Sequence, residues 1–348
     1  MKVVVTGGAG FIGRAIVERL AKRGDDVVAL VRDAGRARFL KDDEGRVTLI
    51  KSDLSSVAQL TAQIKGVDAV VHSAGSYRIG IKDSERDAMW DANVGVTERV
   101  LDAAVAAGVA RIVYVSTANV FGDTRGTSPD ETYRRDEKLG FLSWYDETKY
   151  RAHQAAEDRI KNGAPIVIVM PTQVYGPNDH SQASQLLDDA FHGKLRTVPF
   201  PSTGLAWVHV HDLADGIVAA LDKGRVGESY LLSGDPHRIG ESLNIAARLA
   251  GRKPPRLNAP IGLLKLVAPI NDKLGGLPGL TGNLREAISS GDGVTYWAKH
   301  DKATAELGFK PRSLEQGIVD TWGKPADQRE VESLAAATAA KDEAAGHG

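Results

Sequence analysis

The stretch TGGAGFIG, residues 6–13, constrains the fold of this chain more than any other part of the sequence. It stands between a β-branched run, KVVVT, and a segment with helical apolar spacing, FIGRAIVERLAKRG. Glycines let the backbone turn tightly and approach an anion, and the start of a helix offers free N–H groups at the positive end of its dipole. The order strand, glycines, helix therefore predicts a dinucleotide phosphate site. The candidate residues are Gly7, Gly10, Phe11, Ile12 and Gly13. A turn whose glycines serve only helix–strand packing is the alternative.

Strand and helix signals then alternate through the first half of the chain. The apolar runs DVVALV, RVTLIKSD, VDAVVHSAG, ARIVYVST and PIVIVMP are nearly continuous, which is typical of a parallel sheet covered on both faces. A helix is expected over roughly 84–108 and another from Trp144. Repeated βα units predict an α/β fold with a doubly wound parallel sheet.

The pattern loosens after Pro171. We predict a dinucleotide-binding domain over residues 1–171 and a smaller mixed α/β substrate domain over 172–322, with chain crossings back to the first sheet. The Ala-rich tail over 323–348 is expected to be flexible.

Composition excludes several classes of function. The 348 residues include no cysteine, which rules out disulfides, thiolate catalysis and cysteine-ligated metals. Lys plus Arg is 44 and Asp plus Glu is 45, so no global excess of positive charge favours nucleic acid or a membrane. The chain opens directly on a strand, and its longest apolar run, IGLLKLVAPI at 261–270, is too short to span a bilayer. We expect a cytoplasmic protein with a small-molecule substrate and no nucleic-acid or membrane partner.

No metal site is expected. His209 and His211 alternate in a strand-like run, so their side chains are expected to face opposite ways. Asp212 is expected to cap the helix that follows them.

The end of the second strand bears on the choice of cofactor. NAD-specific sites commonly have an acidic residue at this point, but here Val31 is followed by Arg32. A guanidinium suits the 2′-phosphate of NADP, so NADP(H) is favoured. Asp33 lies next to it and leaves NAD(H) possible, and a solvated loop is the alternative. Asp53, after the third strand, is a candidate for the adenine amino group, for the N-cap of the next helix, or for both.

Two pairs of residues carry the expected chemistry. Tyr145 and Lys149 stand four apart and would share one face of a helix, although a chance surface pair has the same spacing. Ser116 and Thr117 end a buried strand, and ligands of open α/β sheets bind at the carboxyl ends of the strands. Capping of the strand end is their alternative role. Asp146 and Glu147 are expected to be solvated or helix-N-terminal residues outside the chemistry.

The glycine motif, VVHSAG, VSTANVFG, YDETK and MPTQVYGP occur in one order over roughly residues 1–320. Together they resemble the extended short-chain dehydrogenase/reductase superfamily, which includes NAD-dependent epimerase/dehydratases. The resemblance implies a Rossmann domain, a substrate domain and often a homodimer. It also implies Tyr145 as the acid/base and Lys149 as the group that lowers its pKa and binds the ribose. It maps Thr117, beside Ser116, onto the hydroxyl that holds the substrate oxygen, and Asn93 onto a proton-relay position. Further cofactor candidates are Leu54, Ala74 and Pro171.

Departures from the family pattern reduce the number of reaction classes that fit this sequence. Dehydratases usually have an Asp-Glu pair after the threonine, where this chain has Ala118 and Asn119. The chain looks closest to the branch of dihydroflavonol-reductase-like, 3β-hydroxysteroid-dehydrogenase-like and hopanoid-associated sugar epimerase proteins. We predict an NADP(H)-dependent oxidoreductase for a ketone or secondary alcohol. A sugar or nucleotide-sugar epimerase and a noncatalytic dinucleotide-binding protein are the alternatives. Pocket candidates, for which plain packing is the alternative role, are Tyr77, Gln173, Trp207 and His209.

Overall fold

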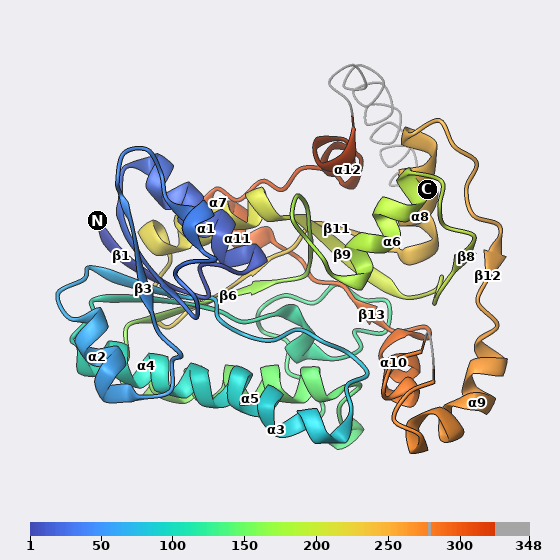
Figure 1. The fold of residues 1–348 in the computed structure, drawn as a ribbon, viewed down its shortest axis with the longest axis horizontal. Helices are drawn as coiled ribbons and strands as arrows, with labels where there is room; N and C mark the ends of the chain where they lie inside the picture. Colours follow the sequence, from blue (N-terminus) through green and yellow to red (C-terminus); the bar gives the residue numbers. More distant parts are fainter. Residues whose placement is uncertain (278–279, 324–348) are drawn as a thin grey trace.

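The computed structural model describes residues 1–277 and 280–323, so the predicted tail lies, apart from Gly323, outside the described residues. Its centre is a seven-stranded parallel sheet in the order β10-β6-β5-β4-β1-β2-β3 (Figure 1). The strands are β1 (Lys2–Thr6), β2 (Asp26–Val31), β3 (Val47–Lys51), β4 (Ala69–His72), β5 (Arg111–Val115), β6 (Ile166–Pro171) and β10 (Ser229–Leu232). The predicted doubly wound fold is confirmed.

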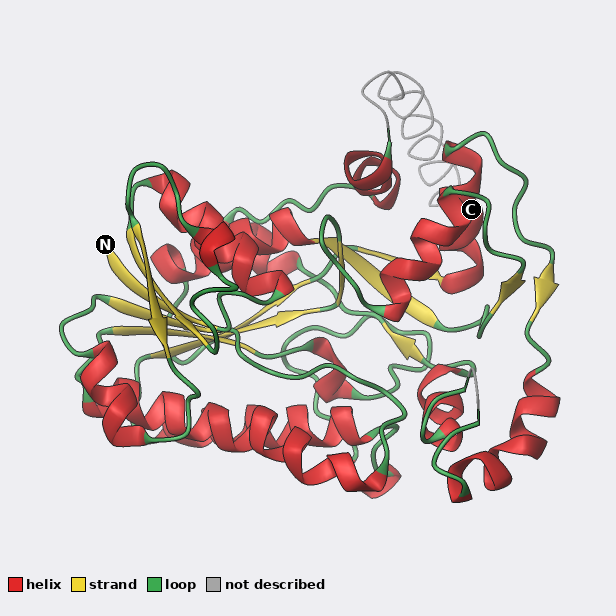
Figure 2. Ribbon diagram, in the orientation of Figure 1, coloured by secondary structure: helices red, strands yellow, loops and turns green. Residues whose placement is uncertain are grey.

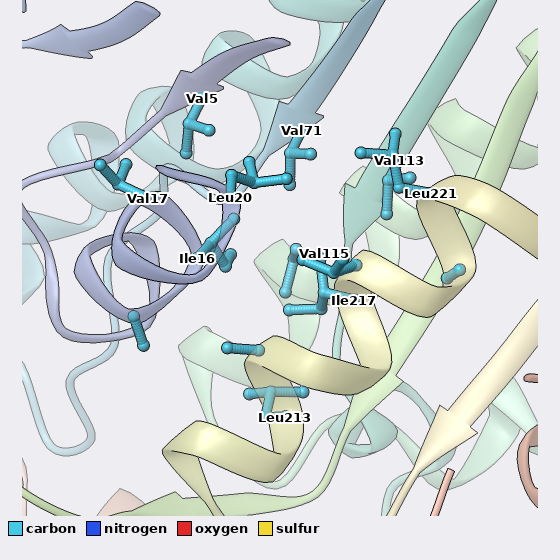
Figure 3. Packing of buried hydrophobic residues seen from close by; sticks show 14 of the residues in the cluster. Val5, Ile16, Val17, Leu20, Val71, Val113, Val115, Leu213, Ile217 and Leu221 are labelled. Atoms are coloured by element: carbon cyan, nitrogen blue, oxygen red, sulfur yellow. The ribbon is translucent and has the colours of Figure 1, made fainter. Parts of the chain in front are cut away.

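Helices cover both faces of this sheet, as Figure 2 shows. One layer consists of α1 (Phe11–Arg23), α7 (Val210–Lys223) and α11 (Asp301–Leu307), and the other of α2 (Val57–Ile64), α4 (Val96–Ala106) and α5 (Trp144–Lys161). Successive strand residues alternate between the two cores: Val3 and Val5 belong to the first, and Val4 to the second. Figure 3 shows the first core, where Ile16 and Leu20 of α1 and Ile217 and Leu221 of α7 pack against valines of the sheet.

The helix predicted over 84–108 is interrupted. It consists of α3 (Arg86–Trp90), a π-helical turn (Asp91–Gly95) and α4, with a 3₁₀ turn before them. The wider turn contains Asn93, which is 1% exposed. π-turns inside helices occur frequently at functional sites.

The second half of the chain builds a smaller sheet in which β9 (Gly204–His209) pairs with β7 (Gln173–Tyr175), β11 (Asp235–Arg238) and β13 (Thr295–Tyr296). The helices α6 (Gln182–Phe191), α8 (Ile239–Leu249) and α12 (Leu314–Trp322) contribute to its core. The short strands β8 (Thr197–Val198) and β12 (Leu257–Asn258) form a pair, and α9 (Ile261–Lys273) packs against α10 (Leu284–Gly291). The chain returns to the first sheet at β10.

Two sequence expectations are wrong at the junction of β9 and α7. The strand ends at His209 and the helix begins at Val210, so the rings of His209 and His211 lie together, with centroids 4.9 Å apart. His209 caps α7 by accepting a hydrogen bond from the His211 N–H, and Asp212 instead accepts hydrogen bonds from Arg312. The expectation of a strand through residue 211 misplaced both groups. In the described part of the chain, no helix is long and apolar enough to cross a membrane.

Candidate active site

The loop between β1 and α1 requires glycine at two positions. Gly7 has φ +70°, and a Cβ there would lie 2.8 Å from the backbone of Ala74. A Cβ on Gly13 would lie 2.1 Å from the Gly7 carbonyl oxygen, so glycine allows α1 to pack against the loop. Gly10 is the N-cap of α1 without a side-chain cap, and the first turn, which begins with Phe11 and Ile12, contains no acidic residue. The N–H groups at the start of α1 therefore remain suited to an anion.

A buried network lies beneath this loop that sequence reasoning missed. Thr6 Oγ1 is 2.7 Å from His72 Nδ1, and His72 Nε2 is 3.0 Å from Thr97 Oγ1. Thr97 in turn donates to the Asn93 carbonyl oxygen. Burial lowers the pKa of His72 to about 3, so its imidazole is neutral and its two nitrogens can act as one donor and one acceptor. A polar His72 inside the apolar run VDAVVH was the signal available in the sequence.

Asn93 is held by the residues around it. Its Oδ1 accepts from the Ser76 N–H at 2.7 Å, and its Nδ2 donates to the Ser76 carbonyl and to Thr148 Oγ1. These bonds join the π-turn to α5 and to the segment that follows β4, where Tyr77 stands. Asn93 therefore positions that segment through its side chain.

Tyr145 lies in the first turn of α5, which Ser143 caps by accepting from the Asp146 N–H at 3.1 Å. The phenol is buried, and the ring of Tyr77 meets it edge-on, with centroids 4.8 Å apart. Burial raises the pKa of Tyr145, and a hydrogen bond with Thr117 acts in the opposite direction. The phenol is thus protonated at neutral pH and able to donate.

Lys149 lies one turn further along α5 and is also buried. Its Nζ donates to the Val115 carbonyl oxygen at 3.2 Å and stands 5.3 Å from the centroid of the Tyr114 ring. Burial lowers the pKa of Lys149 to about 8, which keeps most of the side chain charged at pH 7. Burial, rather than the charge of Lys149, dominates the pKa of Tyr145 here, in contrast to the lowering that the sequence analysis expects.

The two hydroxyls at the end of β5 point to different partners. Ser116 Oγ lies 2.9 Å from His153 Nδ1, and His153 Nε2 lies 3.6 Å from a carboxylate oxygen of Glu157. Thr117 instead contacts Asn119, whose Oδ1 is 3.3 Å from Thr117 Oγ1. Of the two candidates, Thr117 is the one whose hydroxyl acts on the pKa of the Tyr145 phenol through a hydrogen bond.

Asp146 and Glu147 lie in the first turn of α5, which is one of the two places expected for them, but Asp146 is not solvated. Its carboxylate is 0% exposed, Oδ1 accepts from Asn119 Nδ2 at 3.1 Å, and Oδ2 forms no hydrogen bond with the described residues. Burial raises the pKa of Asp146 to about 7. Asp146 and Lys149 are three apart and share a helix face, which the spacing in the sequence could have revealed.

The cofactor candidates beyond the glycine loop follow the carboxyl ends of the strands. Arg32 is exposed and pairs with no acidic residue in the described parts of the chain. Asp33 Oδ1 accepts from the backbone N–H groups of Gly35 and Arg36, so this carboxylate stabilises its own loop. Asp53 accepts from the N–H and hydroxyl of Ser55.

Ser56, rather than Asp53, caps α2. The other three cofactor candidates, Leu54, Ala74 and Pro171, each form a hydrogen bond through the backbone. Leu54 has φ +61°, and its carbonyl accepts from Arg99 Nε. Ala74 N donates to Thr6 Oγ1 at 3.3 Å, and Pro171 ends β6 with its carbonyl 3.4 Å from Thr117 Oγ1.

The four pocket candidates do not all lie near Tyr145. Tyr77 is about half exposed and contacts Tyr145, while Gln173 is partly buried and donates to the neighbouring Val174 carbonyl. Trp207 is 2% exposed, and its indole donates to Ser242 Oγ at 2.9 Å. His209 is 1% exposed and stands edge-on to Tyr175. The last two therefore belong to the core of the smaller sheet rather than to the surroundings of Tyr145.

The chain is similar to a known enzyme family over most of its length. The sequence profile of the NAD dependent epimerase/dehydratase family matches residues 3–233. A putative dihydroflavonol 4-reductase of Synechocystis sp. is 30% identical over 91% of this chain and 92% of its own length. The 2-alkyl-3-oxoalkanoate reductase of Stenotrophomonas maltophilia is 28% identical over 91% and 97%. The crystal structure of gox2253 superposes with a TM-score of 0.76 at 32% identity, covering 92% of this chain and 96% of that one.

The buried carboxyl of Asp146 predicts a pH-dependent stability. Its folded pKa of about 7 lies above 3.8, the ordinary pKa of an aspartate side chain, so the folded state binds the proton more tightly. The free energy of unfolding therefore falls as pH rises from about 4 to about 7, at up to roughly 1.4 kcal/mol per pH unit. Asp146→Asn removes this slope, and the wild type should lose roughly 2–3 kcal/mol more than the variant between pH 5 and pH 8.

Urea unfolding at the two pH values measures this difference. Glu147→Gln is the matched control, because Glu147 lies in the same turn but is only partly buried, and it should keep the wild-type slope. Parallel pH dependence of wild type and Asp146→Asn would show that the carboxyl is not shifted.

Proposed function

Because this chain belongs to the NAD dependent epimerase/dehydratase family, an enzyme family, we propose that it is an NADP(H)-dependent oxidoreductase acting on a ketone or secondary alcohol of a small, fairly apolar molecule. The observation that carries the proposal is the placement of Tyr145, Lys149 and Thr117 at the carboxyl end of β5. Ligands of open α/β sheets bind at this edge.

The residues of the glycine loop fit a dinucleotide. Gly7 and Gly13 leave no room for a Cβ, and α1 presents its uncapped N-terminus where a pyrophosphate would lie. A nicotinamide cofactor, when bound, supplies or accepts the hydride. Lys149 has N–H groups beyond the one given to Val115, and these can hold ribose hydroxyls.

In the reductive direction, Thr117 and Tyr145 bind the carbonyl oxygen of the substrate. Tyr145 gives its phenolic proton to that oxygen as the carbonyl becomes an alcohol. Its raised pKa keeps the proton in place until the oxygen becomes basic. The same raised pKa leaves little tyrosinate in the unliganded site at neutral pH.

Several observations support a reductase over the alternatives. Ala118 and Asn119 occupy the positions where dehydratases have an acidic pair, and Asn119 serves to bind Thr117 and Asp146. Two relatives similar over most of this chain are described as reductases. A sugar or nucleotide-sugar epimerase remains the second candidate because the family is named for it. Stoichiometric consumption of NADPH supports the reductase, whereas product formation with fully recycled cofactor supports the epimerase.

Tyr145→Phe tests the acid role. We expect kcat for NADPH-dependent reduction of an apolar ketone, chosen from a panel of 2-alkanones and aryl ketones, to fall by about 10²–10⁴-fold with little change in NADPH affinity. Tyr150→Phe is the matched control, since Tyr150 lies on the same helix and its hydroxyl bonds Glu137 at the surface. Unchanged activity of Tyr145→Phe would refute the mechanism.

Arg32→Ala tests the cofactor preference. Removing a charge-assisted contact to the 2′-phosphate should weaken NADPH binding by roughly 10–100-fold and leave NADH binding unchanged, as measured by fluorescence titration. Arg46→Ala provides the control, because Arg46 is an arginine paired with Glu44 at 2.6 Å. A wild-type preference for NADH would overturn the assignment.

A further inference from the structure

One edge of the molecule carries a row of exposed apolar side chains. Along α9, Leu263, Leu266, Ile270 and Leu274 are 57%, 74%, 61% and 64% exposed. Their spacing of three, four and four residues places them on one face of the helix and its end. We call these four residues the α9 stripe. The opposite face of α9 is buried, since Ala268 packs with Leu284 and Ile288 of α10.

Positive charge accompanies the α9 stripe. The segment 251–274 contains five basic residues and one acidic residue, in a chain whose formal net charge is −1. Four of the basic residues are exposed and form no ion pair with other described residues: Arg252, Lys253, Arg256 and Lys273. The acidic residue, Asp272, accepts hydrogen bonds from the backbone N–H groups of Leu284 and Arg285, so its charge is directed toward α10.

These features lie along one side of the molecule. In Figure 1 the segment from the end of α8 through β12 and α9 forms the right-hand edge. Leu257 of β12, on the same segment, is 64% exposed. An apolar stripe on a helix that is too short to span a bilayer, with unpaired basic residues at the end of the helix and in the segment before it, is the pattern of a helix lying in a membrane interface. Anionic lipids complement its charge.

We propose that residues 251–274 dock on an anionic phospholipid surface, with the α9 stripe inserted at the boundary of headgroups and acyl chains. This goes beyond the proposed reaction and replaces the expectation of no membrane partner, which rested on the charge of the whole chain and on the lack of a membrane-spanning apolar run. The formal net charge of the chain is −1 because acidic residues elsewhere outweigh the positive charge of this edge.

The docking surface is connected to the candidate active site. Asn283, which caps α10, donates through its N–H to the Gly80 carbonyl at 2.9 Å, and the Gly80 N–H donates to Glu286 Oε1 at 3.2 Å. Gly80 follows Tyr77 on the segment that contacts Tyr145. A membrane-docked α9–α10 pair therefore brings this segment close to the lipid surface, where an apolar substrate would be concentrated.

Sedimentation with vesicles tests the proposal on the full chain. We expect the wild type to bind vesicles of equal parts phosphatidylglycerol and phosphatidylcholine, and to bind pure phosphatidylcholine vesicles at least tenfold more weakly. The double variant Leu266→Gln, Ile270→Gln should bind the anionic vesicles at least tenfold more weakly. Lys273→Gln should bind roughly fivefold more weakly, and 0.5 M NaCl should weaken the wild type.

Val226→Gln is the matched control, because Val226 is 53% exposed in the turn between α7 and β10 and should bind as the wild type does. Circular dichroism and Tm of each variant show that the fold is kept.

Absence of wild-type binding to anionic vesicles, or equal binding by the double variant, would overturn the proposal. Concentration-dependent dimers in sedimentation velocity that the double variant abolishes would assign the stripe to a second copy instead, and would also overturn it. Ketone reduction in detergent-free solution is expected to be unaffected by these variants, which separates this proposal from that of the reaction.

Discussion

The hydrogen bond from Lys149 Nζ to the Val115 carbonyl holds the ammonium group of α5 against the end of β5, and the candidate active site depends on it. The lysine is 7% exposed and pairs with no carboxylate among the residues that the structure describes. A buried ammonium without a counterion is costly, and the lowered pKa of about 8 expresses that cost. The site is therefore arranged to gain from a ligand that supplies further acceptors at this point.

The two halves of the site are linked through buried polar groups rather than through the apolar core. Thr6, next to the glycine loop, reaches Asn93 through His72 and Thr97. Asn93 then binds Thr148, which lies beside Lys149 on α5. Because buried polar groups are costly when unpaired, this series of hydrogen bonds fixes the distance between the phosphate-binding loop and the helix of Tyr145.

The sequence was informative where one residue pattern has one structural solution. Continuous apolar runs such as IVIVM predict buried parallel strands, and TGGAGFIG predicts a turn that admits no Cβ at Gly7 or Gly13. Tyr145 and Lys149 could be paired because helix geometry fixes spacing. Spacing also places Asp146 on the face of Lys149, but the burial of its carboxylate could not be predicted, because it depends on the contact with Asn119 from the segment after β5. The strand–helix break at Val210 was missed because VHVHD continues an alternating pattern, and only the capping by His209 ends it. The identity of the substrate depends on side chains from separate loops, which periodicity does not bring together.

The pH dependence of NADPH affinity between pH 7 and pH 10 tests most directly whether the buried ammonium of Lys149 holds the cofactor. We expect the Kd of the wild type for NADPH to rise above about pH 8, toward tenfold per pH unit, as Lys149 loses its proton. Lys149→Met should bind NADPH more weakly at pH 7 and show no such rise. A wild-type Kd that stays constant up to pH 10, or the same rise in Lys149→Met, would show that the ammonium of Lys149 does not hold the cofactor.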